Sequence, residues 1–508
     1  MHSKVKSLDE IAAILEKKRA AGSRVVQCHG VFDLLHPGHI RHFHEAKTKG
    51  DTLVVTLTPD RFVNKGPGRP VFSETLRLES LAAIQDIDYV VLNDAPDAIT
   101  AIEKVKPNVY VKGIEYANHG KDVTGKISEE VKAVEQGGGH VHYTDDLVFS
   151  SSLLLNQHFD TTPPEVSAFV AGLKQEISLE EILEKIESLK DLKVLIVGDA
   201  IIDEYQYVEP LGQTGKGNHS VAKCLDREVF LGGSLIIANH VAQFSDHVTL
   251  LSAIGKNCPH KTFIQDNLDP KVEQEFVFLE ESTTLVKKRY VLKDGKTLSK
   301  LFETYSGQEI GVSSEQTGRV VEFIKKKSTF FDLVLVADFG NGFTNTPIVQ
   351  ALSATTSFLA VNTQTNSGNR GYNTITKYQR ADYISLNEPE LRLSMHDKSS
   401  EIEGLAVDVL EIMHAQGISV TRGIRGALCF SKQEGFISLP AFVSQSIDRI
   451  GAGDAYLSLS SLSLAGGIPL KFAGFLGALG AAMSVQMIGN QEPIKKAPLI
   501  KFLTRMLK

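Results

Sequence analysis

The chain has 508 residues, of which 42% are hydrophobic and 23% are charged. These values are ordinary for folded proteins, so they exclude a wholly disordered chain, and the length is enough for more than one domain. The net charge of −7 and the lack of a basic block at either end argue against a nucleic-acid-binding protein.

The first 22 residues alternate charged and apolar positions at helical spacing, which predicts an amphipathic surface helix and not a signal peptide. Residues 457–489 form the most apolar stretch, but glycines, Pro469 and Lys471 interrupt it. This pattern predicts buried small-residue helices and no membrane span. The four cysteines lie far apart with no CxxC pair, so we expect reduced thiols and a cytoplasmic protein.

Five short β-branched runs, separated by helical stretches, predict a parallel α/β sheet in the first part of the chain. The runs are residues 24–32, 52–57, 88–93, 108–113 and 140–144. A typical domain size then places the end of the first domain at residue 158.

Two prolines and a charged helix follow, so residues 159–190 are interpreted as a linker and a leading helix. A second α/β domain, residues 191–508, opens with an apolar strand that ends in Gly198 and Asp199. Further strands are expected within residues 332–340, 357–363, 381–387, 417–423 and 426–431. Residues 205–305 are expected to be irregular and partly antiparallel.

The stretch GVFDLLHPGH, residues 30–39, places two histidines at the start of a predicted helix. Pro37 suits the first helical turn, so His36 and His39 lie on one face of that turn, near the positive end of the helix dipole. Such a place attracts phosphate. A zinc pair is an alternative, although zinc needs further ligands, and two histidines without a role are another.

This stretch resembles the HxGH signature of the cytidylyltransferase-like nucleotidyltransferases, and further segments up to residue 156 occur in that family's order. The resemblance implies that His36 and His39 bind the triphosphate of ATP or CTP, with Mg²⁺, and stabilise charge at the α-phosphorus. It also implies these nucleotide- and phosphate-binding residues: Gly30, Phe32, Asp33, Lys47, Lys65, Arg77, Lys112, Ser151 and Ser152. Taken singly, Lys47 and Lys65 could equally be surface lysines. His29 departs from the family, in which a small polar or aromatic residue is common.

A second glycine-rich stretch places Gly451, Ala452 and Gly453 directly before Asp454 and a long helix. Glycines allow successive N–H groups to converge on an anion at a helix start. An aspartate there can take a proton from an attacking hydroxyl.

This stretch resembles the GAGD signature of the ribokinase-like (PfkB) carbohydrate kinases, and supporting motifs extend over residues 193–490. The resemblance implies that Asp454 is the catalytic base and that residues 451–453 bind phosphate from ATP. It further implies a substrate site at Asp199, Asp203, Gly232 and Gly233, and a magnesium pair at Asn387 and Glu390. Helix or strand capping is the alternative for Asp199 and for the Asn387–Glu390 pair.

The implied fold is therefore an N-terminal Rossmann-like nucleotidyltransferase domain followed by a ribokinase-like α/β/α domain with a small β-rich lid. Both halves resemble the bifunctional heptose 7-phosphate kinases and heptose 1-phosphate adenylyltransferases of lipopolysaccharide-core synthesis, in which the kinase comes first. Two departures are Ile236, where a sugar-binding asparagine is usual, and Asn362 within residues 361–366, where that family has Asp-Pro-Lys. We therefore expect a different or modified sugar, or a phosphorylated acceptor with an altered pattern of hydroxyl groups.

The sequence thus predicts a kinase for a sugar or sugar phosphate, joined to a transferase that activates the product with a nucleotide. The expected partners are these substrates and nucleoside triphosphates, with no nucleic acid or membrane, and a homo-oligomer is an expected assembly. One alternative is a cytidylyltransferase for a polyol or glycerol-type phosphate, fused to its kinase. Another is a transferase with a non-catalytic, sugar-binding kinase-like module.

Overall fold

The computed structural model describes residues 3–63, 70–113, 126–144, 163–215, 217–280, 283–294, 297–307, 311–443 and 446–507. The chain divides into two compact units. The N-terminal unit consists of residues 1–167 and 500–505, and the C-terminal unit consists of residues 168–499 and 506–508. The domain limits expected from the sequence stay a prediction, and residue 158 lies outside the described residues.

A six-stranded parallel sheet forms the centre of the N-terminal unit, in the order β1-β4-β3-β2-β5-β6. Its strands are β1 (Val5–Lys6), β2 (Val25–Gly30), β3 (Thr52–Leu57), β4 (Tyr89–Leu92), β5 (Val109–Gly113) and β6 (His140–Thr144). Its helices include α1 (Leu8–Ala20), α2 (Pro37–Thr48), α3 (Glu74–Ala82), α4 (Ile99–Val105) and α5 (Lys126–Gln136). The five strands expected from the sequence are confirmed.

The order of these strands determines where a ligand can bind. β3 lies on one side of β2 and β5 on the other, so the direction of the connections changes between β2 and β5. In open parallel sheets, ligands bind in the crevice beyond the carboxyl ends of the strands at such a point. In this unit those ends are Gly30 and Gly113.

A nine-stranded sheet forms the centre of the C-terminal unit, in the order β11-β10-β7-β14-β15-β16-β17-β18-β19. Its parallel strands are β7 (Lys193–Gly198), β10 (His247–Gly255), β11 (Val272–Leu279), β14 (Leu333–Asp338), β15 (Phe358–Thr363), β16 (Tyr383–Asn387) and β17 (Gly417–Thr421). The antiparallel strands β18 (Ala427–Ser431) and β19 (Gly435–Leu439) complete it.

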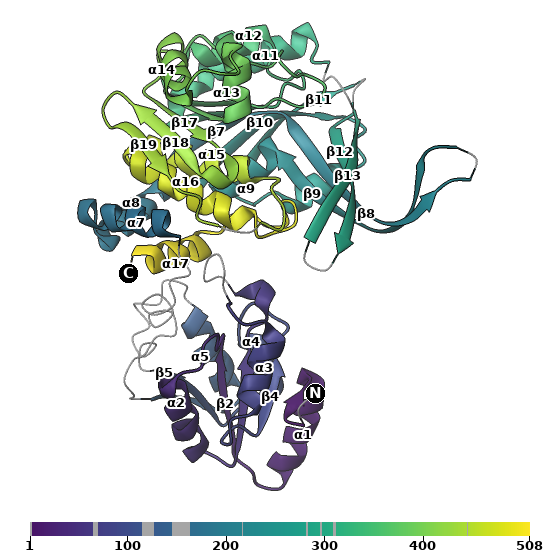
Figure 1. Ribbon diagram of the computed structural model, residues 1–508, viewed down its shortest axis with the longest axis vertical. Coiled ribbons are helices and arrows are strands. Elements are labelled where there is room, and N and C mark those ends of the chain that lie inside the picture. The colour runs from purple at the N-terminus through teal and green to yellow at the C-terminus, as the bar shows by residue number, and fades with distance from the viewer. Residues whose placement is uncertain are drawn as a thin grey trace. The chain divides into compact units, whose positions relative to one another are not determined.

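Helices cover both faces of this sheet, as the buried apolar strands require. Figure 1 shows α11 (Ser314–Lys327), α12 (Thr346–Ser353), α13 (Glu388–Met395) and α14 (Ile402–Ile412) on one face. The other face carries α9 (Ser234–Ala242), α15 (Ala452–Ala465) and α16 (Leu470–Ser484) (Figure 1). The remaining helices are α7 (Pro164–Glu176), α8 (Leu179–Ser188), α10 (Lys261–Asn267) and α17 (Lys496–Leu507).

The glycine-rich helices α15 and α16 are buried, as the sequence predicts. Glycines let the two helices approach closely, because a Cβ at Gly477 would lie 3.0 Å from the Tyr456 carbonyl oxygen. None of the helices in the described part of the chain is long and apolar enough to cross a membrane.

A second sheet, in the order β13-β12-β8-β9, corresponds to the expected β-rich lid. It consists of β8 (Ala200–Gln213), β9 (Ser220–Gly233), β12 (Leu285–Asp294) and β13 (Thr297–Ser306). β8 and β9 form an antiparallel hairpin whose outer part is exposed and extends away from the sheets (Figure 1). Cys224 lies on this exposed part, whereas Cys28, Cys258 and Cys429 are buried free thiols.

The expectation of irregular structure in residues 205–305 is wrong. The stretch is built from regular elements, and β10 and β11 add two parallel strands to the main sheet. β11 was not predicted from the sequence, because its middle residues are polar or partly exposed. The strand therefore lacks the apolar run of a central parallel strand.

Candidate active sites

The two histidines of the N-terminal unit lie together at the start of α2. His36 is the residue before the helix and Pro37 opens it, as predicted. The His36 and His39 rings stack with their centroids 3.9 Å apart, and His36 is buried. Burial lowers the pKa of His36, because it disfavours the charged imidazolium. The two stacked rings lie beside the first N–H groups of α2.

A tight turn after β2 holds this pair in place. Phe32 adopts a left-handed backbone conformation with φ of 47°, and its ring meets the His39 ring edge-on at 5.3 Å. The same ring lies over Gly30, where a Cβ would be only 3.0 Å from it. The Asp33 carboxylate accepts hydrogen bonds from the N–H groups of Val71 and Phe72, at 2.7 and 3.1 Å. Gly30, Phe32 and Asp33 thus shape the turn that carries the histidines.

Lys47 and Arg77 are each engaged by other protein groups. Lys47 lies near the far end of α2, where its Nζ contacts Asp88 at 2.5 Å. Arg77 is 1% exposed, and its guanidinium is held by the Asp60 carboxylate at 2.7 Å and by three backbone carbonyl groups. Arg77 thus links several loop segments through hydrogen bonds, and the contacts of both cations favour structural roles.

The other expected phosphate-binding residues of this unit are placed as follows. Lys112 lies near the carboxyl end of β5, at the point where the connections change direction, and its Nζ pairs with Glu130 at 2.7 Å. Lys65, Ser151 and Ser152 lie outside the described residues. His29, which departs from the family pattern, lies between Thr56 and Thr58 of the β3 region, at 2.9 and 3.2 Å from their hydroxyl oxygens.

In the C-terminal unit, Asp454 lies in the first turn of α15, close to the carboxyl ends of the central strands. Gly451 precedes the helix with φ of +82°, and a Cβ there would lie 2.0 Å from the Asn490 side-chain oxygen, so only glycine fits. The Ala452 and Gly453 amides are among the first N–H groups of α15, which have no acceptor within the helix. The turn therefore presents anion-binding amides next to a carboxylate.

Asp454 is buried, and its pKa is raised to about 7. Burial is the largest cause and the nearby negative charge of Asp203 adds to it, whereas Lys287 and a hydrogen bond from Gln364 act in the opposite direction. A carboxylate with a pKa near the operating pH is suited to general-base catalysis.

Asp203, on β8, forms a buried ion pair with Arg289 of β12 at 2.5 Å. Gly232 allows this carboxylate to approach β9, because a Cβ there would lie 2.5 Å from Asp203 Oδ2. Gly233 has φ of +58°, and a Cβ would lie 2.5 Å from the Asp199 carbonyl oxygen. The two glycines thus keep the backbone of β9 close to both aspartates.

The Asp199 side chain is hydrogen-bonded to the backbone of the loop after β14. Its carboxylate accepts hydrogen bonds from the N–H groups of Phe339, Asn341 and Phe343, at 2.9, 3.4 and 3.4 Å. Burial, followed by the charge of Asp338, raises its pKa to about 6. This geometry favours the capping alternative for Asp199 over contact with a sugar hydroxyl.

Asn387 and Glu390 form a reciprocal capping box at the start of α13. The Glu390 N–H donates to Asn387 Oδ1 at 2.8 Å, and the Asn387 N–H donates to Glu390 Oε2 at 2.9 Å. Burial raises the pKa of Glu390 to about 7. The donor set of amide and carboxylate oxygens still fits Mg²⁺, because each oxygen that accepts an N–H keeps a second lone pair for the water shell of the ion.

The two departures from the kinase pattern lie in buried positions. Ile236 is 1% exposed within α9. The Asn362 side chain donates a hydrogen bond to the Ser385 carbonyl oxygen at 2.7 Å and so joins β15 to β16.

The sequence did not single out Lys287 or Gln364, which both act on Asp454. Lys287 is buried, forms no ion pair with the described residues, and lies between the rings of Tyr305 and Phe339, at 5.6 and 5.5 Å from their centroids. Burial lowers its pKa. Only the pairing of β12 with β8 brings this lysine near the site, and no local motif marks it.

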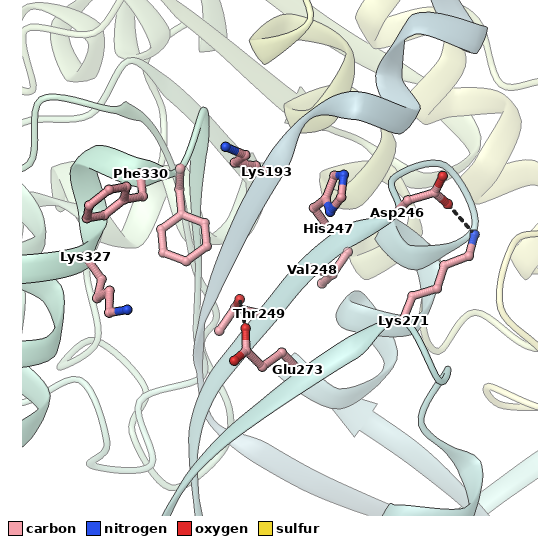
Figure 2. Close-up of a pocket in the computed structure, with 10 residues that line it drawn as sticks. Lys193, Asp246, His247, Val248, Thr249, Lys271, Glu273, Lys327 and Phe330 are labelled. Carbon is pink, nitrogen blue, oxygen red and sulfur yellow. Dashed lines mark hydrogen bonds and ion pairs between the residues drawn. The ribbon is translucent and has the colours of Figure 1, made fainter.

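A cavity at the opposite edge of the main sheet contains none of these residues. It lies at the amino ends of β7 and β10, where Lys193 and His247 begin the strands (Figure 2). Asp246 and Lys271 form an ion pair at its rim, at 2.8 Å. Because catalytic crevices of parallel sheets form at the carboxyl ends, this cavity is not the expected active site.

Curated relatives match a limited part of the chain. Proteins named "Bifunctional protein HldE" are 43% identical in Geobacter metallireducens and 41% identical in Citrifermentans bemidjiense, each over 141 residues. The same name is carried by a protein of Aliarcobacter butzleri that is 36% identical over 137 residues. The matched part covers 26% to 27% of this chain and 27% to 28% of those relatives.

Solved structures resemble the chain in fold. Phosphofructokinase-2 from Escherichia coli, in complex with fructose-6-phosphate, superposes with a TM-score of 0.50 and 13% identity, over 62% of this chain and 100% of that chain. A second structure of that enzyme, with substrates and products, gives a TM-score of 0.50 and 12% identity over the same shares. At this identity the likeness shows the ribokinase-like fold alone.

Two family models match in succession along the chain. Residues 28–198 match the model described as cytidylyltransferase-like, in agreement with the Rossmann-like sheet and the histidine pair of the N-terminal unit. Residues 191–497, well over half of the chain, match the model of the pfkB family of carbohydrate kinases. The buried aspartate behind a glycine turn, the nine-stranded sheet and this match agree, and the chain belongs to the pfkB carbohydrate kinase family.

Proposed function

We propose that the chain is a bifunctional enzyme that makes a nucleotide-activated sugar for surface polysaccharide. The C-terminal unit phosphorylates a sugar or sugar phosphate at its anomeric hydroxyl. The N-terminal unit then transfers a nucleotidyl group from ATP or CTP to the new phosphate and releases pyrophosphate. The product of the first reaction belongs to the class of substrate that the second consumes, which supports their presence on one chain.

The observation that carries this proposal is the position of Asp454. Its carboxylate is buried at the start of α15, beside the free amides of Ala452 and Gly453. The acceptor hydroxyl oxygen attacks the γ-phosphorus of ATP while its proton passes to Asp454. The bond from the γ-phosphorus to its bridging oxygen breaks and ADP leaves, as the two amides donate hydrogen bonds to the developing negative charge.

Asn387 and Glu390 would hold the Mg²⁺ that accompanies the nucleotide. The ion neutralises charge on the phosphate groups when it is bound. The capping box fixes both side chains at the end of β16, so the oxygens that would hold the ion have defined positions.

In the N-terminal unit, a phosphate oxygen of the sugar phosphate attacks the α-phosphorus of the triphosphate, and pyrophosphate leaves. This reaction needs positioning and charge neutralisation and no covalent enzyme intermediate. His36 and His39 lie at the positive end of the α2 dipole, where a triphosphate is favoured. We assign them to the triphosphate.

The resemblance to the heptose kinases and adenylyltransferases supports a heptose-like acceptor, and the matches to proteins named HldE agree with this class. Here, however, the transferase model precedes the kinase model. Ile236 stands where a sugar-binding asparagine is usual, and Asn362 lies where the heptose family has Asp-Pro-Lys, and such changes in a sugar site alter selectivity. We therefore propose an acceptor with an altered pattern of hydroxyl groups.

The kinase is tested by ATP-dependent phosphorylation of a panel that includes heptose 7-phosphate, fructose 6-phosphate and unphosphorylated sugars. We expect the parent chain to phosphorylate at least one of them, and Asp454→Ala to lower that rate at least about 100-fold, because it removes the base. Asp266→Ala, on the exposed side of α10, is the control. Equal acceptor-dependent rates in the parent and Asp454→Ala would contradict the kinase assignment and favour a sugar-binding module.

The transferase is tested by pyrophosphate release from each of the four ribonucleoside triphosphates with a panel of sugar 1-phosphates. We expect release with ATP or CTP. Release with neither, under conditions in which the protein is folded, would exclude the proposed transfer.

A further inference from the structure

The contacts of Gln364 with the catalytic base carry an inference that rests on the proposed kinase function. Gln364 directly follows β15, and its Nε2 donates a hydrogen bond to Asp454 Oδ1 at 2.9 Å. Among the described residues, Oδ2 of Asp454 receives no hydrogen bond. The two oxygens of the base are therefore in different environments.

The backbone around Gln364 is fixed on both sides. Its N–H donates to the Asp338 carbonyl oxygen at 2.8 Å, and its own carbonyl accepts a hydrogen bond from the Asn373 side chain at 3.0 Å. The next N–H, of Thr365, donates to Glu390 Oε1 at 3.3 Å. One short loop thus touches both the base and the glutamate of the proposed magnesium pair.

We propose that Gln364 is a positioning residue, which fixes the Asp454 side chain so that Oδ2 is the oxygen that takes the acceptor proton. A neutral amide suits this task. It donates to the carboxylate and favours the charged, basic form, but it brings no positive charge that would form a tight ion pair with the base. The role is distinct from substrate binding, because Gln364 acts on the reaction through Asp454.

The test compares two replacements of similar length, Gln364→Met and Gln364→Lys, with the parent chain. Methionine cannot donate a hydrogen bond, so we expect kcat at neutral pH to fall about tenfold, while KM for ATP and for the acceptor change little. The rise of kcat with pH should move to higher pH, because the carboxylate loses a donor. Lysine retains a donor and adds a positive charge, so the rise should move to lower pH.

Two charged groups, Asp203 and Lys287, affect the pKa of Asp454, and the charge of Asp454 affects the pKa of Glu390. All three are unchanged in both variants, so opposite shifts of the two pH profiles report on position 364. Gln243→Met is the matched control, because Gln243 donates a hydrogen bond to Asp269 at 2.8 Å elsewhere in the same unit. It should leave the pH profile of kcat unchanged.

The acceptor used is the one from the panel above with the highest rate. Pronounced loss of kcat with opposite displacements of the two profiles supports the proposal. Profiles that coincide with that of the parent, or a rise of KM without a change of kcat, would overturn it while the kinase function stands. A parent chain that behaves like Asp454→Ala would instead overturn the proposed function, and this inference with it.

Discussion

At the scale of single residues, the protonation of Asp454 predicts how the kinase responds to pH. Burial raises the pKa of this carboxyl group to about 7, and only the ionised form can accept a proton. Activity should therefore be low in acid and rise with pH through about 7. The measurement is kcat for acceptor phosphorylation at a series of pH values under saturating ATP. A rate that is constant between about pH 5 and pH 8 would contradict this role, since an ordinary aspartate would be ionised throughout.

Lys287 gives a second prediction at this scale. The Lys287 ammonium is buried and forms no ion pair among the described residues, although the carboxylates of Asp203, Asp454 and Glu303 lie near enough to act on it. A phosphate anion bound at the site would therefore stabilise it. We expect Lys287→Met to lower kcat about 10- to 100-fold, because it removes a positive charge near the phosphoryl group in transfer, and Lys287→Arg to restore part of the loss. Lys288→Met is the control on the same strand, since the Lys288 ammonium pairs with Glu204. Equal losses in both variants would indicate a general disturbance of β12.

Lys287 and Gln364 are site residues that could not be predicted from the sequence. Asp454 and the histidine pair stand in local motifs, so their positions at helix starts could be predicted. The cation and the donor that tune Asp454 come from β12 and from the loop after β15, which only the sheet pairing brings to α15. Arg77 is the converse case, because its place in the motif order predicts a phosphate contact, whereas its burial and its hydrogen bonds favour a structural role.

At the scale of elements, the contacts of Arg77 should contribute to the stability of the N-terminal unit. Its guanidinium joins three carbonyl groups and Asp60 around the loops that follow β2 and β3. Arg77→Leu removes a buried guanidinium that donates to four buried or partly buried acceptors, so we expect the free energy of unfolding to fall by about 3–5 kcal/mol. Calorimetry of the intact chain measures this. Arg61→Ala is the control, because the Arg61 side chain is 55% exposed where it pairs with Asp94. Similar effects of both changes would contradict a special role for Arg77.

The elements that could be predicted are those with strong periodic signals. Apolar, β-branched runs predicted β2 to β6 and six strands of the second unit, namely β7 and β14 to β18. β1 could not be predicted, since two residues carry no period. The ends of the lid strands β8 and β9 could not be predicted, because their outer halves are exposed and mix polar with apolar residues, and they are held together by pairing with each other.

At the scale of the whole molecule, the two proposed activities should be separable. All the described residues assigned to nucleotidyl transfer belong to one compact unit, and those assigned to phosphorylation belong to the other. We expect His36→Ala to abolish pyrophosphate release while the kinase rate stays near that of the parent, and Asp454→Ala to do the reverse when the sugar 1-phosphate is supplied. Assays of both reactions on both variants check this. Loss of both activities in either variant would show that the sites depend on each other.

Cys224, on the exposed part of the β8–β9 hairpin, offers a site for specific labelling of the native chain. Cys224 is the one exposed cysteine among the four, and burial raises the pKa values of the Cys28 and Cys429 thiols, which suppresses their reactive thiolate forms. A maleimide fluorophore should therefore modify the wild-type protein at the hairpin without any engineered cysteine. The emission of such a probe would report on the surroundings of the hairpin during turnover, in the unaltered enzyme.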